Sequence, residues 1–223
     1  MARQARIVLA EAPHHVTQRG NRGEKIFFEK ADFETYIDLL REQCDDKDVA
    51  ILSYCLLPNQ IHLVAVPRSE TALAAAIGET HRRYTVHINA KNSWRGHLFQ
   101  DRFFSYAMDD RFMLRAARFI ENLPVVSGIA PKAENYLWSS ARCHVRLAEN
   151  PLIKNKTVLK IMPDWIAFLD RPMDPQEMEN IRLHLQTGRP RGSEGFIDAV
   201  EATIGRAVRP QKRGRKPKAQ AAA

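Results

Sequence analysis

The sequence predicts an α+β protein: a ferredoxin-like sandwich whose antiparallel sheet carries helices on one face, then a small helical C-terminal extension and a basic tail. Three observations lead to this prediction. Strand-like and helix-like segments follow one another in the order β-α-β-β-α-β over residues 1–147. Only helical patterns follow in residues 148–205. Residues 206–223 are rich in Lys and Arg and contain no acidic residue.

The first half of the sandwich is predicted from successive segments whose apolar residues are spaced as in a strand, then as in a helix, then again as in strands. Residues 14–20, HHVTQRG, alternate and contain β-branched side chains, which is typical of a strand. Residues 31–47 place apolar side chains on one helical stripe and predict a helix. Residues 49–57, VAILSYCLL, form a continuous apolar run that predicts a second strand, and a Pro-Asn turn leads into the third strand at 61–66.

The second half repeats the pattern. Residues 70–89 show helical spacing and are expected to form the second helix. Residues 102–108, RFFSYAM, predict the last strand. Residues 109–123 predict another helix, because Asp109 and Asp110 lie where its positive N-terminal end would be.

The C-terminal extension is expected to contain two short helices, at 174–188 and 193–205. The first begins with acidic residues and ends at a Gly, as helices commonly do. Joined by RPRG, the pair fits either a small helix-turn-helix unit or a helical hairpin without a role in DNA binding. The tail that follows is predicted to be disordered from its composition.

Composition limits the class of protein. A chain of 223 residues, 44% of them hydrophobic, is long enough for one substantial domain. No apolar run approaches the roughly 20 residues of a membrane span, and the N-terminus lacks a signal-peptide pattern. The three cysteines show no Cys-x-x-Cys spacing, which predicts free thiols in a reducing compartment. We therefore expect a cytoplasmic protein without a membrane partner.

The net charge of +8 comes from the tail. Seven basic residues follow residue 205, and without them 27 basic residues face 26 acidic ones. Within RPQKRGRKPK, the cations Arg213, Arg215 and Lys216 flank a Gly-Arg core that resembles an AT-hook. The alternative is a generic polycation held by phosphates, and both interpretations predict affinity for nucleic acid.

One strand carries an unusual polar pair. Gln60 and His62 are two residues apart in LLPNQIHLVAVP, so they would project from the same face of the strand. A histidine on an apolar strand is more often a hydrogen-bonded core residue than a metal ligand, and a neutral amide is a weak ligand beside it. The residues alone leave both interpretations open.

A second cluster alternates cations with aromatic rings. Residues 80–104, THRRYTVHINAKNSWRGHLFQDRFF, have the composition of a surface that binds phosphates and unpaired bases. The loop TQRGNRGEK at 17–25 adds further cations. The alternative for the cluster is a solvated helix face followed by a core strand.

Four ordered segments resemble a known family. PHHVTQRGNRG, YCLLPNQIHLV, HRRYTVHINAKNSWRGHLFQDRFF and WSSARCH are similar to the small tyrosine transposases with a His-hydrophobic-His motif, in the REP-associated branch found in bacteria. The resemblance covers about residues 1–147. It implies a ferredoxin-like fold that binds DNA hairpins and cuts single strands, with a metal on paired histidines and a helical tyrosine that attacks the phosphate.

The chain departs from this pattern at the centre of the implied site. Gln60 stands at the first metal-ligand position and only His62 is retained at the second. Phe119 stands where the family has its nucleophilic tyrosine, and Leu123 replaces a polar residue. Phe119 has no oxygen and cannot form a phosphotyrosine. The resemblance therefore implies an impaired catalytic site, with Mg²⁺ or Mn²⁺ bound weakly at Gln60 and His62 or not at all.

The sequence thus predicts a DNA-binding member of the transposase family that has lost strand cleavage. Alternatives are an active transposase whose chemistry has moved, for example to Tyr84, and an RNA-binding regulator on the same fold. The expected partner is hairpin or single-stranded DNA in the bacterial nucleoid, with monomer and homodimer both open. The body is expected to hold DNA through Arg19, Asn21, Arg22, His81, Arg82, Arg83 and Arg102.

Overall fold

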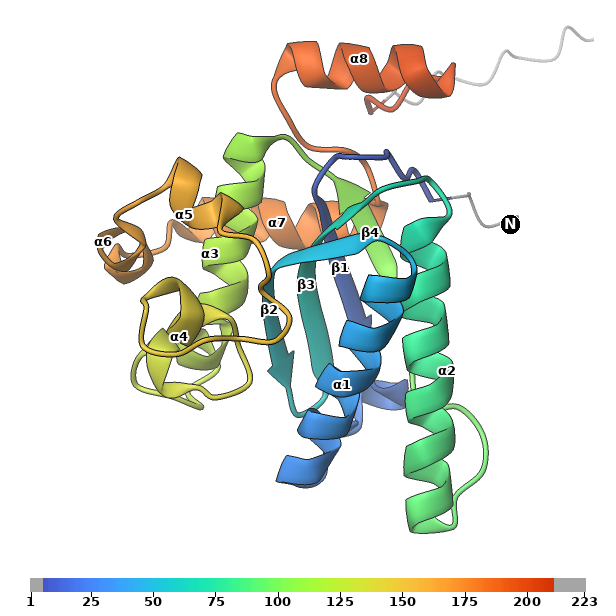
Figure 1. Cartoon of the computed structure of the whole chain (residues 1–223). Helices are drawn as coiled ribbons and strands as arrows, with labels where there is room; N and C mark the ends of the chain where they lie inside the picture. The colour runs from blue at the N-terminus through green and yellow to red at the C-terminus, as the bar shows by residue number, and fades with distance from the viewer. Residues whose placement is uncertain (1–5, 211–223) are drawn as a thin grey trace, which may run out of the picture.

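The computed structural model describes residues 6–210. Its centre is a four-stranded sheet in the order β2-β3-β1-β4, in which every pairing is antiparallel. The strands are β1 (His14–Arg19), β2 (Val49–Leu57), β3 (Gln60–Pro67) and β4 (Phe104–Ala107). Figure 1 shows that β2 and β3 form a hairpin, while β1 and β4 join it across helical connections. This is the ferredoxin-like arrangement that the order of elements predicted.

Helices cover both faces of the sheet. On one face lie α1 (Lys30–Asp46) and α2 (Ala72–Asn92), the two helices of the predicted sandwich. On the other lies α3 (Asp110–Val126), which follows β4 (Figure 1). Neighbouring residues of β3 separate the two cores, because Leu63 packs with α1 and α2 whereas Val64 packs with α3.

Local signals explain where these helices begin and end. At α1, Glu29 and Asp32 form a capping box, and at α3 the Asp109 side chain accepts a hydrogen bond from the Phe112 amide. The α2 helix stops at Ser93, which has a left-handed backbone with φ of 56°. These ends differ from the predicted ones by no more than three residues.

The C-terminal extension packs onto the α3 face. Besides the turns η1 (Asn21–Gly23) and η2 (Ala133–Asn135), the remaining helices are α4 (Ala141–His144), α5 (Thr157–Ile161), α6 (Trp165–Asp170), α7 (Pro175–Thr187) and α8 (Glu194–Ile204). Side chains of α5, α6 and α7 enter the same apolar core as α3. Arg191 then donates its backbone amide to the Ala107 carbonyl of β4. The extension is thus joined to the sandwich by a shared apolar core and by a backbone hydrogen bond to β4.

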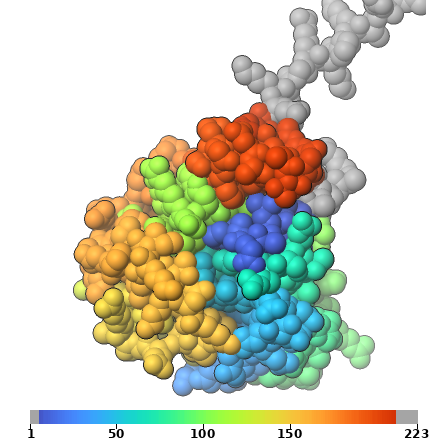
Figure 2. Space-filling model, turned by 45° about the horizontal axis from the view of Figure 1, so that its top comes forward, coloured from blue at the N-terminus to red at the C-terminus, as the bar shows by residue number. Residues whose placement is uncertain are grey.

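The structure contradicts the helix-turn-helix alternative for the last two helices. Ile181 and Leu185 of α7 are buried against the sheet, whereas α8 contributes no residue to that core. Figure 1 shows α8 lying across the end of the sheet at which β1 begins, away from α7, and Figure 2 shows its red surface beside the dark-blue N-terminal segment. Within the described chain, no helix is both long and apolar enough to span a bilayer.

Candidate functional site

Three strands and α3 bring a polar cluster together in the core of the α3 face. His15 Nε2 lies 3.1 Å from His62 Nδ1, and His62 Nε2 lies 3.4 Å from the side-chain amide oxygen (Oε1) of Gln60. On the other side, His15 Nδ1 lies 3.3 Å from the hydroxyl of Tyr106. The Phe119 ring stands edge-on to both imidazoles at 6.2 Å between centroids. The three predicted catalytic positions therefore meet in one cluster.

The hydrogen bonds of this cluster form a chain with one direction. The side-chain amide oxygen of Gln60 can only accept, so His62 Nε2 donates to it and His62 Nδ1 accepts from His15 Nε2. His15 Nδ1 in turn accepts from the Tyr106 hydroxyl. Each imidazole in this arrangement is neutral, with one nitrogen donating and the other accepting. Reversing it requires both imidazoles to change tautomer together.

Burial keeps both histidines uncharged. Desolvation, followed by the charge of Arg19, lowers the pKa of His62 from 6.5 to about 3. Desolvation and the neighbouring His62 hold the pKa of His15 well below its ordinary value. Burial likewise raises the pKa of the Tyr106 hydroxyl, so this phenol keeps its proton. At neutral pH the cluster carries no charge of its own.

The donor set does not fit a resident Mg²⁺ or Mn²⁺. These ions prefer several oxygen donors, usually with carboxylates among them. The cluster offers an amide oxygen and imidazoles that bond one another. Across residues 6–210, no group of three or more His, Cys, Asp or Glu side chains is arranged to hold a metal ion. Gln60 and His62 alone therefore do not supply the donors that either ion prefers.

The sequence reasoning missed two members of the cluster, His15 and Tyr106. The signal for His15 was present, because the β1 strand places it on the same face as Thr17, which pairs with His62. Tyr106 gave no such signal, because it lies in a segment that reads as a core strand. Its ring contacts His15 and also His184 of α7, so the extension closes this side of the cluster.

Tyr84, the alternative nucleophile, is placed wrongly for that role. It is fully buried on the opposite face of the sheet, where its hydroxyl donates to the Ile26 carbonyl at 2.8 Å. Burial also raises the pKa of its hydroxyl. Tyr84 lies on the apolar stripe of α2 and packs in the core, so its presence needs no catalytic role to explain it.

The predicted DNA-binding residues divide into two groups. Arg19, Arg22 and Arg102 are exposed, and Arg19 pairs with Gln60 across β1 and β3 at the edge of the cluster. Asn21 is exposed as well, and its backbone amide also positions a loop by donating to the Leu98 carbonyl at 2.8 Å. These residues come from the short loop after β1 and the segment before β4.

The predicted contacts on α2 are engaged within the protein. Arg82 forms an ion pair with Glu79, and Arg83 with Glu42, each at 2.6 Å. His81 packs against Phe99 and hydrogen-bonds to a tyrosine hydroxyl, and burial lowers its pKa to about 3. The predicted tail contacts Arg213, Arg215 and Lys216 lie outside the described residues.

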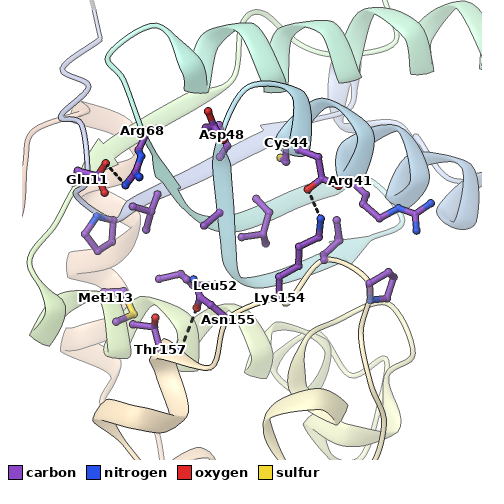
Figure 3. A pocket seen from close by; sticks show the side chains of 18 of the residues that line it. Glu11, Arg41, Cys44, Asp48, Leu52, Arg68, Met113, Lys154, Asn155 and Thr157 are labelled. Carbon is purple, nitrogen blue, oxygen red and sulfur yellow. Dashed lines mark hydrogen bonds and ion pairs between the residues drawn. The ribbon is translucent and has the colours of Figure 1, made fainter.

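A separate pocket of about 580 Å³ lies between α1, β2 and the segment before α5 (Figure 3). Its floor is apolar, with Leu52 and Met113 among the lining residues. Its rim carries charges that pair with one another, Arg68 with Glu11 and Lys154 with Asp45. This neutralised rim is unsuited to a phosphate backbone.

Comparisons with known proteins give the chain its family. The family model for IS200-like transposases matches residues 10–123. The structure of a REP-associated tyrosine transposase bound to a REP hairpin superposes with a TM-score of 0.57 at 14% identity, over 71% of this chain and 96% of that one. A transposase candidate from Deinococcus radiodurans, 16% identical, covers 54% of this chain and 97% of its own, but its TM-score of 0.38 is too low for an argument. A comparison with curated proteins finds no match. On the family match over residues 10–123, the chain belongs to the IS200-like transposases.

Proposed function

We propose that this protein binds hairpin and adjoining single-stranded DNA and has lost the ability to cut it. One observation carries the proposal: the side chain that faces the imidazole cluster from α3 is Phe119, which has no nucleophilic atom. The neighbouring Gln60 stands where the family pattern has a metal ligand. Two of the three positions that the family pattern uses for cleavage are thus changed in the same cluster, and only His62 is retained.

The binding half of the proposal rests on charge and on the family. Arg19, Arg22 and Arg102 remain exposed around the loop after β1, although the body as a whole is nearly neutral. A structural neighbour was solved with a REP hairpin, and the same class of ligand is the natural candidate here. The role that follows is that of a repressor, a nucleoid-associated protein or a helper of an active relative.

Residues 1–147 are proposed as the DNA-recognising domain, with residues 148–205 as a buttress. The extension holds α3 in place, because Arg118 donates to the carbonyls of Arg171 and Pro172, and Asn122 to that of Leu169. Residues 206–223 are proposed to add sequence-independent affinity. Arg209 is an exception, since Glu194 and neighbouring acids of α8 neutralise it.

Fluorescence anisotropy with matched oligonucleotides tests this function. We expect a DNA hairpin to bind more tightly than a fully paired duplex or an unstructured strand of the same composition. An RNA hairpin of equal sequence separates the RNA-binding alternative, because the 2′-hydroxyl distinguishes the two ligands. Equal affinity for all DNA forms, or a preference for the RNA hairpin, would refute the proposal.

A further inference from the structure

Two exposed aromatic rings lie together beside the loop after β1. Phe28 is 42% exposed and Trp94 is 50% exposed, and their rings meet edge to face at 5.4 Å between centroids. They lie at the edge of a cleft of about 370 Å³, at the low end of the range for small-molecule sites. Contiguous exposed apolar surface with a polar rim is a feature of ligand-binding grooves.

The backbone around Trp94 is built to hold the indole in this position. After α2 ends at Ser93, the Trp94 amide donates to the Asn89 carbonyl at 2.8 Å, and the Asn89 side chain donates to the Gly96 carbonyl at 3.0 Å. Asn21 ties the same loop to η1. The loop backbone that carries the ring is therefore ordered by its own hydrogen bonds, which lowers the entropic cost of binding.

The rim of the cleft carries a net positive charge. Arg22, Lys25 and Arg95 line it together with one acid, Glu24, and among residues 6–210 none of the three cations forms an ion pair. This contrasts with α2, where Arg82 and Arg83 are paired with acids. Unpaired cations around an exposed ring match a base with its flanking phosphates, since the ring offers a stacking face and the cations neutralise the backbone.

The cleft continues toward the imidazole cluster. Lys25 and Glu24 also line a second cleft, of about 410 Å³, whose other wall includes Gln60 and Ser127. Figure 1 shows why the two are adjacent: the end of α2, the β2–β3 turn and the end of α3 lie at the same end of the molecule. A strand lying in the aromatic cleft can pass Lys25 and reach Gln60.

We propose that the Phe28–Trp94 cleft takes one unpaired nucleobase from a single-stranded segment next to a DNA hairpin, and that this segment runs past Lys25 to Gln60. The inference rests on the proposed function, because it assigns the part of the ligand that is not paired. The base stacks on the exposed indole, while Phe28 supports the indole edge-on and Arg22, Lys25 and Arg95 hold the flanking phosphates.

Binding measurements with three DNA ligands test the proposal: a blunt hairpin, the same hairpin with a four-nucleotide extension, and the extension strand alone. The extension should tighten binding by the wild-type protein. Trp94→Ala should weaken binding of the extended hairpin by about 5- to 150-fold, the range for loss of one base–aromatic stack, and leave the blunt hairpin unaffected. Val86→Ala, at a 59% exposed position on α2 outside the cleft, is the matched control.

A second readout does not depend on affinity. 2-Aminopurine placed in turn at each position of the extension should change its fluorescence at one position on binding, and Trp94→Ala should abolish that change. Phe28→Ala should reduce it, and both variants are checked for wild-type thermal unfolding. Arg95→Ala should lower the salt dependence by about 0.7, the value for one single-strand phosphate that is no longer neutralised.

The outcomes separate the two proposals. If Trp94→Ala binds the extended hairpin as tightly as wild type, or weakens blunt and extended hairpins equally, the cleft assignment is wrong while hairpin binding stands. If wild type shows no preference for a hairpin but the extension strand alone still depends on Trp94, the proposed function fails and the cleft assignment stands.

Discussion

At the scale of single residues, the account depends on Phe119 and Gln60. If cleavage is lost as proposed, reversing both should introduce part of the family's chemistry, because Phe119→Tyr supplies a hydroxyl next to the two imidazoles and Gln60→His supplies a ligand beside His62. We expect the double variant to nick a hairpin with a single-stranded extension in Mn²⁺. Gel assays measure nicking, with each single variant as control. If the double variant does not nick DNA, Phe119 and Gln60 do not by themselves account for the proposed loss of cleavage.

The buried histidines predict a dependence of stability on pH. Their folded pKa values lie below the ordinary 6.5, at about 3 for His62 and His81 and about 4 for His14. Between these values and 6.5 the unfolded chain binds more protons, so the free energy of unfolding should fall as the pH drops from about 6.5 toward 4. Each histidine contributes a slope of up to about 1.4 kcal/mol per pH unit.

Urea unfolding of His62→Gln across this range measures one of these contributions. The variant should lose stability less steeply than wild type as the pH falls, because one proton-binding group of the unfolded chain is gone. His87→Gln, at an exposed position on α2, is the matched control. A slope for His62→Gln equal to that of wild type would contradict the assignment of His62 as a buried neutral imidazole.

At the scale of elements, a buried carboxylate joins the sandwich to its extension. Glu121 of α3 is fully buried and accepts hydrogen bonds from Ser53 of β2, from Ser140, from His144 at 2.6 Å and from Trp165 of α6 at 2.7 Å. Burying a carboxylate costs free energy unless hydrogen-bond donors satisfy it, so these four donors must stay in place around Glu121. The network therefore fixes α3, and with it Phe119, against the sheet.

Removing one donor should loosen the extension. Trp165→Phe keeps an aromatic ring but loses the indole hydrogen bond to Glu121, which we expect to cost about 1.5–3 kcal/mol of the free energy of unfolding. Denaturant unfolding measures this change. The matched control is Trp138→Phe, because Trp138 packs against both cores and stacks on Phe33 but makes no hydrogen bond with Glu121. Equal costs for the two variants would contradict a special role for the carboxylate.

The sequence predicted elements better than it predicted contacts. All four strands and the five longer helices were expected within a few residues, because each carries a hydrophobic pattern or end signals of its own. The helices α5 and α6, with five and six residues, are too short to show a period. Gln60, His62 and Phe119 were placed in one site only through the family pattern. That His15 bonds to His62, and that Glu121 reaches Trp165, follows from tertiary packing that no local pattern encodes.

At the scale of the whole molecule, recognition is expected near the β2–β3 turn, and the basic tail is expected to add general affinity. The exposed cations and the aromatic cleft lie near the β2–β3 turn, whereas α8, which precedes the tail, lies at the other end of the sheet (Figure 1). Truncation after Pro210 tests this division and spares Arg209, which α8 needs for its ion pairs.

The truncated chain should keep its preference for a hairpin. Its affinity should fall and its salt dependence should flatten, by about 0.7–0.9 for each phosphate that the tail neutralises in the full chain. Anisotropy titrations at several salt concentrations measure both quantities. If the hairpin preference disappears with the tail, recognition does not reside in the sandwich.

The most direct test of the central claim is a search for a covalent protein–DNA adduct. Wild-type protein is incubated with a hairpin that carries a single-stranded extension, in Mg²⁺ or Mn²⁺, and analysed by denaturing gels and mass spectrometry. The account predicts bound DNA that stays uncut and no adduct on any tyrosine. Strand cleavage that leaves DNA attached to any tyrosine would contradict it. Tyr106 is the first tyrosine to examine, because its hydroxyl contacts the His15 imidazole.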